Sequence, residues 1–311
     1  MFWQKIIFWL LIFVCLTTWV SPPIALVFGL IAAFTFGNPF PQQTKKATKI
    51  LLQISVVLLG FGMNLTEVVK AGKQGILFTI ATIFGTLAVG FFLGRLLKVK
   101  DKTSNLISAG TAICGGSAIA AVAPVIDADD EEISVSLGTV FILNSIALFI
   151  FPAIGHFFNL SQNQFGIWAA IAIHDTSSVV GAAQSYGAEA LSIATTVKLA
   201  RALWIAPVAL LFAFLYRGRN EKKAKIAVPY FVLFFLLVTV VRTYAPPEFP
   251  PSLFDSLVIL AKKGLTVTLF LIGASLSRET LKKVGIKPLV QGILLWILIS
   301  VISLWAVLNL L

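Results

Sequence analysis

The sequence predicts an all-helical protein that crosses a membrane many times and forms a single transmembrane domain over residues 1–311. Hydrophobic residues make up 58% of the 311 positions and charged residues only 12%, whereas a soluble domain has roughly 25% charged residues. The mean hydropathy of +0.96 agrees with this class. The apolar residues lie in long runs, and no stretch between them is large enough for a soluble domain.

Eleven apolar stretches approach or exceed the roughly 20 residues that a helix needs to cross about 30 Å of hydrocarbon. The first follows Lys5 as in a signal peptide, but it has no small-x-small cleavage site before Ser21, so we expect a retained helix. The second is short and flanked by proline. The predicted spans are residues 3–20, 22–37, 48–64, 74–94, 103–126, 132–158, 164–186, 188–215, 226–243, 252–276 and 288–310.

Cysteine content and charge limit the chemistry further. Cys15 and Cys114 both lie in apolar stretches, so we expect neither a disulfide nor a metal site, and no motif requires a cofactor. The net charge of +11 is spread over several short loops, which argues against nucleic acid as a partner. The expected partners are the lipid bilayer and a small substrate.

Basic residues in the loops indicate the orientation, because Lys and Arg in short loops favour the cytoplasm. With a cytoplasmic N-terminus, the inner side holds 17 basic residues and the outer loops hold three, and the acidic run Asp127–Glu132 falls outside. The inner residues are Lys5, Lys45, Lys46, Lys49, Arg95, Lys98, Lys100, Lys102, Arg217, Arg219, Lys222, Lys223, Lys225, Arg278, Lys282, Lys283 and Lys287. The outer residues are Lys70, Lys73 and Arg242.

Two of the spans are interrupted near their middle by small polar residues, as Cys-Gly-Gly-Ser in one and His-Asp-Thr-Ser-Ser in the other. An offset of 60 residues aligns Ile113 with Ile173, Cys114 with His174 and Ser117 with Ser177. A helix broken at mid-depth begins again with free N–H groups and a partial positive charge, which favour an anion. The candidate substrate-binding residues at the breaks are Cys114, Gly115, Gly116, Ser117, His174, Asp175, Thr176, Ser177 and Ser178.

The residue types at the breaks fit this role. Ser117, Thr176 and Ser177 are of the kind that cap helix starts, and Gly115 and Gly116 let the backbone turn and let a ligand approach it closely. The alternative is that patches of small residues only permit close helix packing.

Lys198 and Arg201 complete the candidate substrate site, because they share one helical face near the middle of a span. Charged residues at the bilayer centre cost roughly 2.5–3.5 kcal/mol each on insertion scales, so both need a partner. Asp175 or Glu189 would supply a structural ion pair, whereas an anionic substrate would supply a functional one. Both alternatives stay open at this point.

His174 and Asp175 are the coupling candidates, since such residues at membrane depth are typical proton relays. A polar pair that merely joins two helices, or an intramembrane enzyme, are the other interpretations. An enzyme would also need a nucleophile or a metal, and no such motif is present. Among secondary candidates, Asn144 faces the site or bonds a neighbouring helix, and Lys262 and Lys263 reach a surface or line a water-filled cleft.

Residues 58–70 are similar in sequence to residues 269–281, with Gly62 matching Gly273 and Leu65 matching Leu276. The first copy ends outside and the second inside, which predicts an inverted repeat. The two broken spans, however, come out parallel in this topology, whereas an inverted pair should run in opposite directions. The sequence leaves their pairing open.

The runs SAGTAICGGSAIAAVAPVIDADDEEIS, AIAIHDTSSVVGAAQSYG and TTVKLARALWIAPVALL resemble the YeiH-like family of bacterial inner-membrane proteins, which are catalogued as sulfate exporters. The resemblance extends from about Asn38 to the end of the chain. More distantly, GMNLT and the broken Cys-Gly-Gly span are similar to the bile acid:sodium symporter superfamily, whose members have panel and core subdomains and crossed broken helices. The resemblance implies an elevator-type secondary transporter of the bacterial inner membrane, and the superfamily implies a homodimer.

We therefore expect a secondary active transporter that exports a small anion, such as sulfate, a related sulfur oxyanion or an organic anion, and not an enzyme. An anion channel is the main alternative, and an intramembrane enzyme using His174 and Asp175 is another. The distant relatives use sodium, but no acidic cluster here identifies a sodium site. The coupling ion, H⁺ or Na⁺, stays open.

Overall fold

The computed structural model describes residues 2–17, 19–63, 65–216, 230–246, 250–275 and 284–310, and every regular element within these ranges is a helix. The predicted all-helical class is therefore confirmed. Five helical stretches among the described residues are long and apolar enough to cross a membrane, and three shorter apolar helices accompany them. The five stretches are Thr79–Leu96, Glu131–Phe157, Ala188–Leu215, Ser252–Ser275 and Ile286–Leu310.

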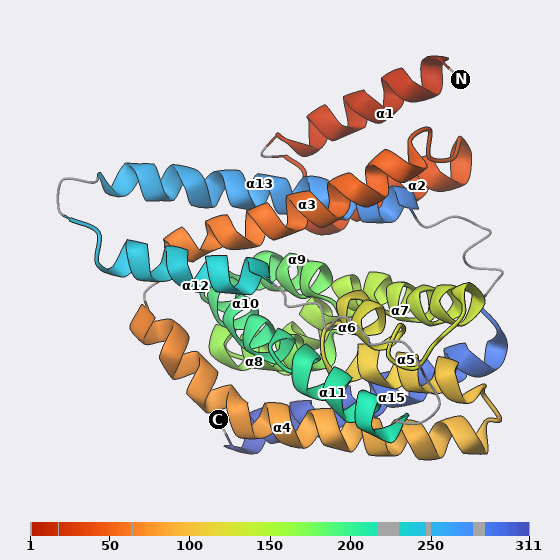
Figure 1. The fold of residues 1–311 in the computed structure, drawn as a ribbon. Coiled ribbons are helices and arrows are strands. Elements are labelled where there is room, and N and C mark those ends of the chain that lie inside the picture. The colour runs from red at the N-terminus through yellow and green to blue at the C-terminus, as the bar shows by residue number, and fades with distance from the viewer. Residues whose placement is uncertain are drawn as a thin grey trace.

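A first layer of helices forms the top of the molecule in Figure 1, with α13 lying along α2 and α3. Its elements are α1 (Phe2–Cys15), α2 (Pro22–Thr35), α3 (Pro41–Leu59), η1 (Gly60–Gly62), α12 (Tyr230–Thr243) and α13 (Pro251–Ser275). Proline at the start of α2 and α3 suits a helix N-terminus, where its missing N–H has no intrahelical partner. Gly29 brings α2 against α13, since a methyl group added there would lie 2.1 Å from the Phe270 carbonyl oxygen.

The second layer contains the interrupted helices and lies below the first in Figure 1. Its elements are α4 (Leu65–Leu96), α5 (Asp101–Ala112), α6 (Gly116–Val122), α7 (Asp130–Phe157), α8 (Gln162–Ala172), α9 (Thr176–Tyr186), α10 (Ala188–Ala202), α11 (Ile205–Leu215) and α15 (Ile286–Leu310). The two layers meet where α9 contacts α2 and α13.

Several predicted boundaries change. The first span ends at Cys15, and α3 begins at Pro41, so the basic residues Lys45, Lys46 and Lys49, which were expected in a loop, lie in a helix. The outer loop expected over residues 65–73 is helical and belongs to α4, which begins at Leu65. The span predicted over 188–215 is interrupted by a turn at Leu203 and Trp204. Pro207 explains the turn, because it has no N–H for the Leu203 carbonyl and its ring crowds that residue.

Several predicted features lie outside the described residues. These are Asn64, the basic loops 217–225 and 278–283, the start of the span at 226–229 and the end of the second repeat copy at 276–281. The internal repeat therefore stays a prediction.

The break at 113–115 reverses the chain, so α5 and α6 form a helical hairpin, which we call the first hairpin (residues 101–122). The two helices contact each other. The Lys102 ammonium donates to the Asp127 carbonyl, and Lys100 Nζ lies 3.8 Å from Glu131 Oε1. The residues before α5 and those after α6 thus lie on the same side of the molecule, which we call the basic side.

The break at 173–175 reverses the chain in the same way, so α8 and α9 form the second hairpin (residues 162–186). The Tyr186 hydroxyl at its end donates to the Leu160 carbonyl at its start over 2.6 Å, and the Tyr186 and Phe165 rings stack at 3.8 Å. Gln162 Oε1 also accepts from the Glu189 N–H at 3.0 Å.

The two hairpins enter the molecule from opposite sides, because α7 runs from the start of the first to the start of the second. Ser136, near the beginning of α7, donates to the Thr103 carbonyl in α5 at 3.3 Å, and only residues 158–161 separate the end of α7 from α8. At 1.5 Å per residue, α7 is about 42 Å long, whereas α5 and α8 are each less than 20 Å long.

This arrangement corrects the predicted topology. Residues 103–126 and 164–186 are broken as predicted, but each segment returns to the side on which it began instead of crossing. The acidic run Asp127–Glu132 therefore lies on the basic side, together with Lys100 and Lys102. The prediction that it lies on the opposite side is wrong. The two broken segments also point in opposite directions, which removes the conflict with an inverted pair.

Candidate functional site

The tips of the two hairpins touch at the centre of the second layer. A methyl group added at Gly115 would lie 3.1 Å from Asp175 Cβ and 3.3 Å from Val140 Cγ1. Gly115 has φ +66° and ψ −124°, a conformation that favours glycine. The tip of the first hairpin therefore depends on a glycine both for its backbone turn and for its contact with the second hairpin.

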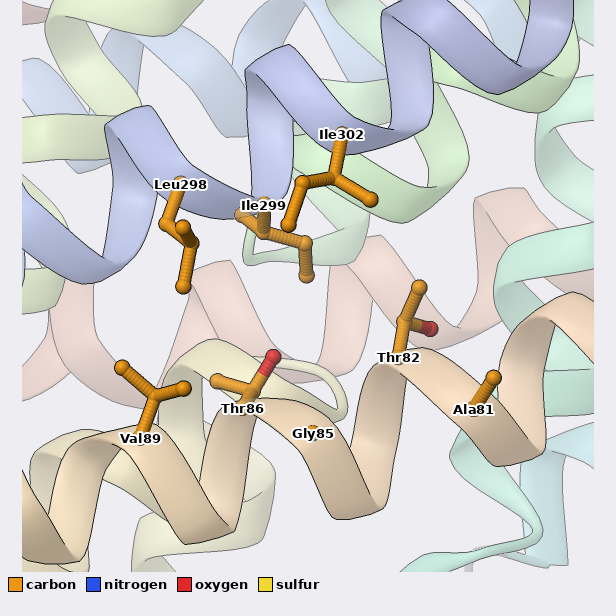
Figure 2. A pocket seen from close by; sticks show the side chains of 8 residues that line it. All are labelled: Ala81, Thr82, Gly85, Thr86, Val89, Leu298, Ile299 and Ile302. Atoms are coloured by element: carbon orange, nitrogen blue, oxygen red, sulfur yellow. The ribbon is translucent and has the colours of Figure 1, made fainter.

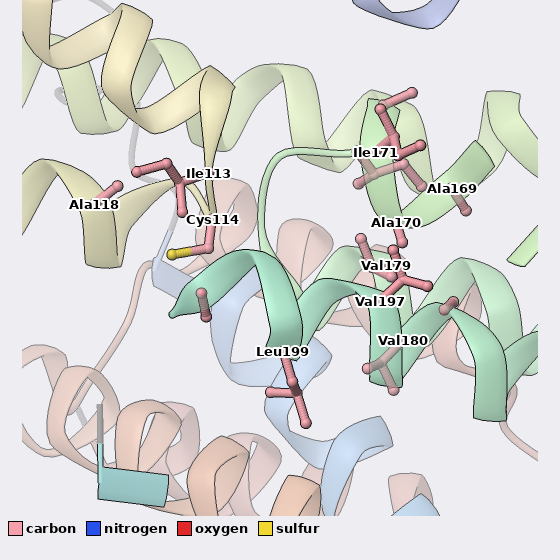
Figure 3. Close-up of a cluster of buried hydrophobic side chains, with 14 of the residues drawn as sticks. Ile113, Cys114, Ala118, Ala169, Ala170, Ile171, Val179, Val180, Val197 and Leu199 are labelled. Carbon is pink, nitrogen blue, oxygen red and sulfur yellow. The ribbon is translucent and has the colours of Figure 1, made fainter. Parts of the chain in front are cut away.

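The predicted offset of 60 residues is confirmed in the local structure. Ile113 and Ile173 are the C-cap residues of α5 and α8, and Gly115 and Asp175 are the N-cap residues of α6 and α9. Cys114 and His174 thus occupy equivalent positions between the half-helices. Figure 3 shows Cys114 at the turn of the first hairpin, with α10 passing beside it.

Asp175 caps the second hairpin's return helix. Its Oδ1 accepts from the Ser178 N–H at 2.8 Å and from the Ser177 hydroxyl, and its Oδ2 accepts from the Ser178 hydroxyl at 2.8 Å. An acidic cap satisfies a free amide and complements the positive end of the helix. Thr176, Ser177 and Ser178 are buried in the first turn of α9, so the cap is Asp175, and not Thr176 or Ser177 as the sequence predicted. Ser117 likewise lies within α6, whose N-cap is Gly115.

Lys198 caps the end of the second hairpin's first helix. The side chain is fully buried in α10, and its ammonium donates to the Ile173 carbonyl at 2.7 Å and the Ala170 carbonyl at 3.2 Å. Carbonyls at the end of a helix have no N–H partner within the helix, and they carry a partial negative charge. The Lys198 ammonium supplies both the missing donor and the opposite charge.

Arg201 caps the end of the first helix of the first hairpin. Its guanidinium donates to the Ala112 carbonyl at the end of α5 and to the Thr82 hydroxyl of α4 at 2.8 Å. Lys198 and Arg201 thus each bind the negative end of a different half-helix. Among the described residues neither forms a salt bridge, so the ion pairs considered with Asp175 and Glu189 do not form here.

His174 and Asn144 form the other contact at the second tip. The Asn144 side-chain oxygen accepts from the His174 backbone N–H at 3.0 Å, so Asn144 joins α7 to the tip. The His174 ring is fully buried, lies near the charges of Lys198 and Arg201, and has no hydrogen-bond partner for either nitrogen among the described residues. His174 and Asp175 do not bond each other.

Several buried donors around the tips have no partner among the described residues. They are Thr111 Oγ1, Asn144 Nδ2, Arg201 Nε and whichever His174 nitrogen carries the proton. Thr111 and Thr82 were not predicted. Their signal is weak, because isolated threonines in apolar helices usually bond their own backbone.

The remaining candidates lie at the edge of this group or outside it. Ser117 is exposed and Gly116 half-buried, so the first hairpin turns these residues outwards. Lys262 and Lys263 belong to α13 in the first layer and are half-buried, and the Lys263 ammonium donates to the Leu16 carbonyl after α1.

A crevice of about 380 Å³ lies between α4 and α15 (Figure 2). Its walls are mainly apolar, with Val89, Leu298 and Ile302 among them, and Thr82 lies at one end. Because Thr82 accepts from Arg201, one side chain separates the crevice from the charged centre.

Comparison with known proteins assigns the family. The model of the family described as conserved hypothetical protein 698 matches residues 10–305. The chain is 55% identical to a UPF0324 membrane protein of Porphyromonas gingivalis over 93% of this chain and 87% of that one. It is 52% identical to a UPF0324 membrane protein of Geobacter sulfurreducens over 96% of this chain and 94% of that one. No solved structure matches significantly. The chain therefore belongs to the UPF0324 membrane protein family, which is the YeiH-like family that its motifs resemble.

Proposed function

We propose that this membrane protein is a secondary active transporter of a small anion that works by alternating access. The observation that carries the proposal is the meeting of two opposed hairpin tips beside two buried cations, Lys198 and Arg201, with unpaired buried donors around them. A buried donor without an acceptor costs about 1–3 kcal/mol. Unpaired hydrogen-bond donors suit a ligand with many acceptor atoms, and an oxyanion is such a ligand.

The charges around the tips also favour an anion. The two cations outweigh Asp175, and the partial charges of about −0.5 at the ends of α5 and α8 are balanced by about +0.5 at the starts of α6 and α9. With a neutral His174, the centre keeps a net charge of about +1. The resemblance to the sulfate exporters makes sulfate and related sulfur oxyanions the first substrates to test.

The opposed hairpins supply a route for alternating access, since each separates the centre from one side of the membrane. The basic loop at 95–102 supports a cytoplasmic basic side, a cytoplasmic N-terminus and an inner-membrane location. His174 is the favoured coupling residue, because its ring is unpaired, whereas the Asp175 carboxylate is engaged with Ser177 and Ser178. An anion channel could use the same centre, but it would conduct without a coupled ion gradient.

Ligand-dependent thermal unfolding tests the proposal. Purified protein is heated with sulfate, sulfite, thiosulfate, organosulfonates or dicarboxylates, at two pH values and with or without sodium. A bound ligand at about 100 times its Kd stabilises by about 2.7 kcal/mol. We expect one class of anion to stabilise the wild type and Lys263→Met but not the double variant Lys198→Met, Arg201→Met. No stabilisation by any anion would contradict the proposal.

Flux measurements in proteoliposomes then separate a transporter from a channel. Uptake of the stabilising anion driven by a pH or sodium gradient, without net current of the anion alone, indicates coupled transport. Current that persists without either gradient indicates a channel.

A further inference from the structure

We infer that Lys198 and Arg201 are side-specific latches, with Lys198 holding the second hairpin closed and Arg201 holding the first. The inference rests on the proposed transport function and assigns each cation to one of its two gates. Helix α10 passes both hairpin tips. Its residues 198 and 201 are three apart, a rise of about 4.5 Å along the helix, and they bind the ends of two different half-helices.

The contacts are divided cleanly between the hairpins. The Lys198 ammonium donates only to carbonyls of the second hairpin, at Ala170 and Ile173. The Arg201 guanidinium donates to the Ala112 carbonyl of the first hairpin and, through its other nitrogen, to Thr82 in α4. Neither contact involves a residue of the other hairpin. One hairpin can therefore lose its cation while the other keeps its own.

Each latch acts at the point where release would open the centre. The end of a half-helix has unpaired carbonyls, and away from water these need a donor. When Arg201 is bound, the carbonyl of Ala112 is satisfied and the first tip stays against Asp175. Because the first hairpin enters from the basic side, its withdrawal exposes the centre to that side only. Withdrawal of the second hairpin exposes the opposite side.

Cys114 provides a reporter at the meeting point. The chain has two cysteines, so Cys15→Ser leaves Cys114, which is 4% exposed, as the single thiol. Its modification by a membrane-impermeant thiosulfonate, which forms a mixed disulfide with the thiol and releases a sulfinate, is measured in right-side-out and in inverted membrane vesicles. The variants are Lys198→Met and Arg201→Met. The control is Lys263→Met, because Lys263 also donates to a carbonyl beyond a helix end but lies in the first layer.

The two variants should accelerate labelling from opposite faces of the membrane. Loss of a hydrogen bond to a charged donor predicts about ten- to hundredfold faster labelling. Arg201→Met should show this from the basic side, Lys198→Met from the other side, and Lys263→Met from neither. Faster labelling from both sides in either variant indicates loosened packing and overturns the inference, as does unchanged labelling in both.

Two additions keep the result interpretable. If a methionine variant is not recovered in the membrane, the glutamine variant replaces it; it retains amide donors without the charge, and a smaller change on the same side is expected. Protection of Cys114 by sulfate, organosulfonates and dicarboxylates is measured in parallel; sulfite and thiosulfate are omitted because they react with the thiosulfonate. Side-specific labelling without protection by any anion would support the latches and contradict the proposed substrate class, whereas protection without side specificity would do the reverse.

Discussion

Replacing Gly115 with alanine tests the contact between the two tips. A non-glycine residue at this φ of +66° costs about 1–3 kcal/mol. The new methyl group would also lie 3.1–3.4 Å from Cβ and Cα of Asp175 and from Val140, so the tips or α7 would have to shift by a few tenths of an ångström. Overpacking of this kind typically adds 1–3 kcal/mol.

Gly37→Ala is the matched control. Gly37 also has a positive φ, +77°, but nothing lies within 4 Å of the position that its Cβ would take. Both variants place a side chain at a positive φ, but only Gly115→Ala also crowds the contact between the tips. We expect Gly115→Ala to be less stable than Gly37→Ala by about 1–3 kcal/mol.

Thermal unfolding of the purified variants measures this difference, at roughly 2 °C in Tm per kcal/mol for a chain of this size. The proposed transport function also predicts that flux of the stabilising anion falls in Gly115→Ala and stays near wild type in Gly37→Ala. Equal stability of the two variants would refute the contact between the tips, and with it the closed state on which the latches depend.

Substitutions at three further positions test other parts of the structure. Gly85→Ala should stabilise the protein by about 0.5–1 kcal/mol in thermal unfolding, because Gly85 lies within α4 and a methyl group there meets nothing within 4 Å. Asp175→Ala should destabilise by about 1 kcal/mol through loss of the cap on α9, whereas Asp175→Asn should keep most of the stability. If Asn also retains coupled flux, the carboxylate only caps the helix. Gly94→Ala should cost more than 1 kcal/mol, because its methyl group would lie 1.9 Å from the Ser104 hydroxyl oxygen, and a wild-type Tm would contradict that packing of α4 on α5.

The composition and the two matched breaks in the apolar stretches predict the helical class and the position of the candidate site. They do not predict that the chain reverses at each break. The helical class follows from apolar runs, and the pairing of Cys114 with His174 follows from a repeated pattern of apolar and small residues. The two halves of a broken segment have the same hydropathy whether they continue across the bilayer or turn back. Half-helices of 12 and 11 residues before each break fit either arrangement.

The charges in the sequence contain a sign of the first reversal, but the count of basic residues does not use it. The acidic run Asp127–Glu132 complements the basic residues before α5, and Lys100 pairs with Glu131 in the structure. The rule for basic loops gives little weight to acidic residues, so it could not report this contact. Two reversals also cancel in the count of crossings, so the sides predicted for the later basic loops do not depend on them. The orientation of the other loops therefore did not reveal the error.

The partners of Lys198 and Arg201 could not be predicted for a different reason. A sequence shows which side chains carry opposite charge, but the acceptors here are backbone carbonyls that become available only where α5 and α8 end. This difference also affects specificity. A cation bound to a carboxylate is neutralised, whereas one bound to the end of a half-helix meets only about half a charge. Because both cations are held in this way, the tips keep a positive centre while staying closed, and an anion can be attracted without first breaking an ion pair. Introducing a carboxylate beside Arg201, as in Thr82→Asp, should therefore abolish anion-dependent stabilisation while leaving the protein folded in detergent. Retained anion binding in that variant would show that the charge of Arg201 does not reach the substrate.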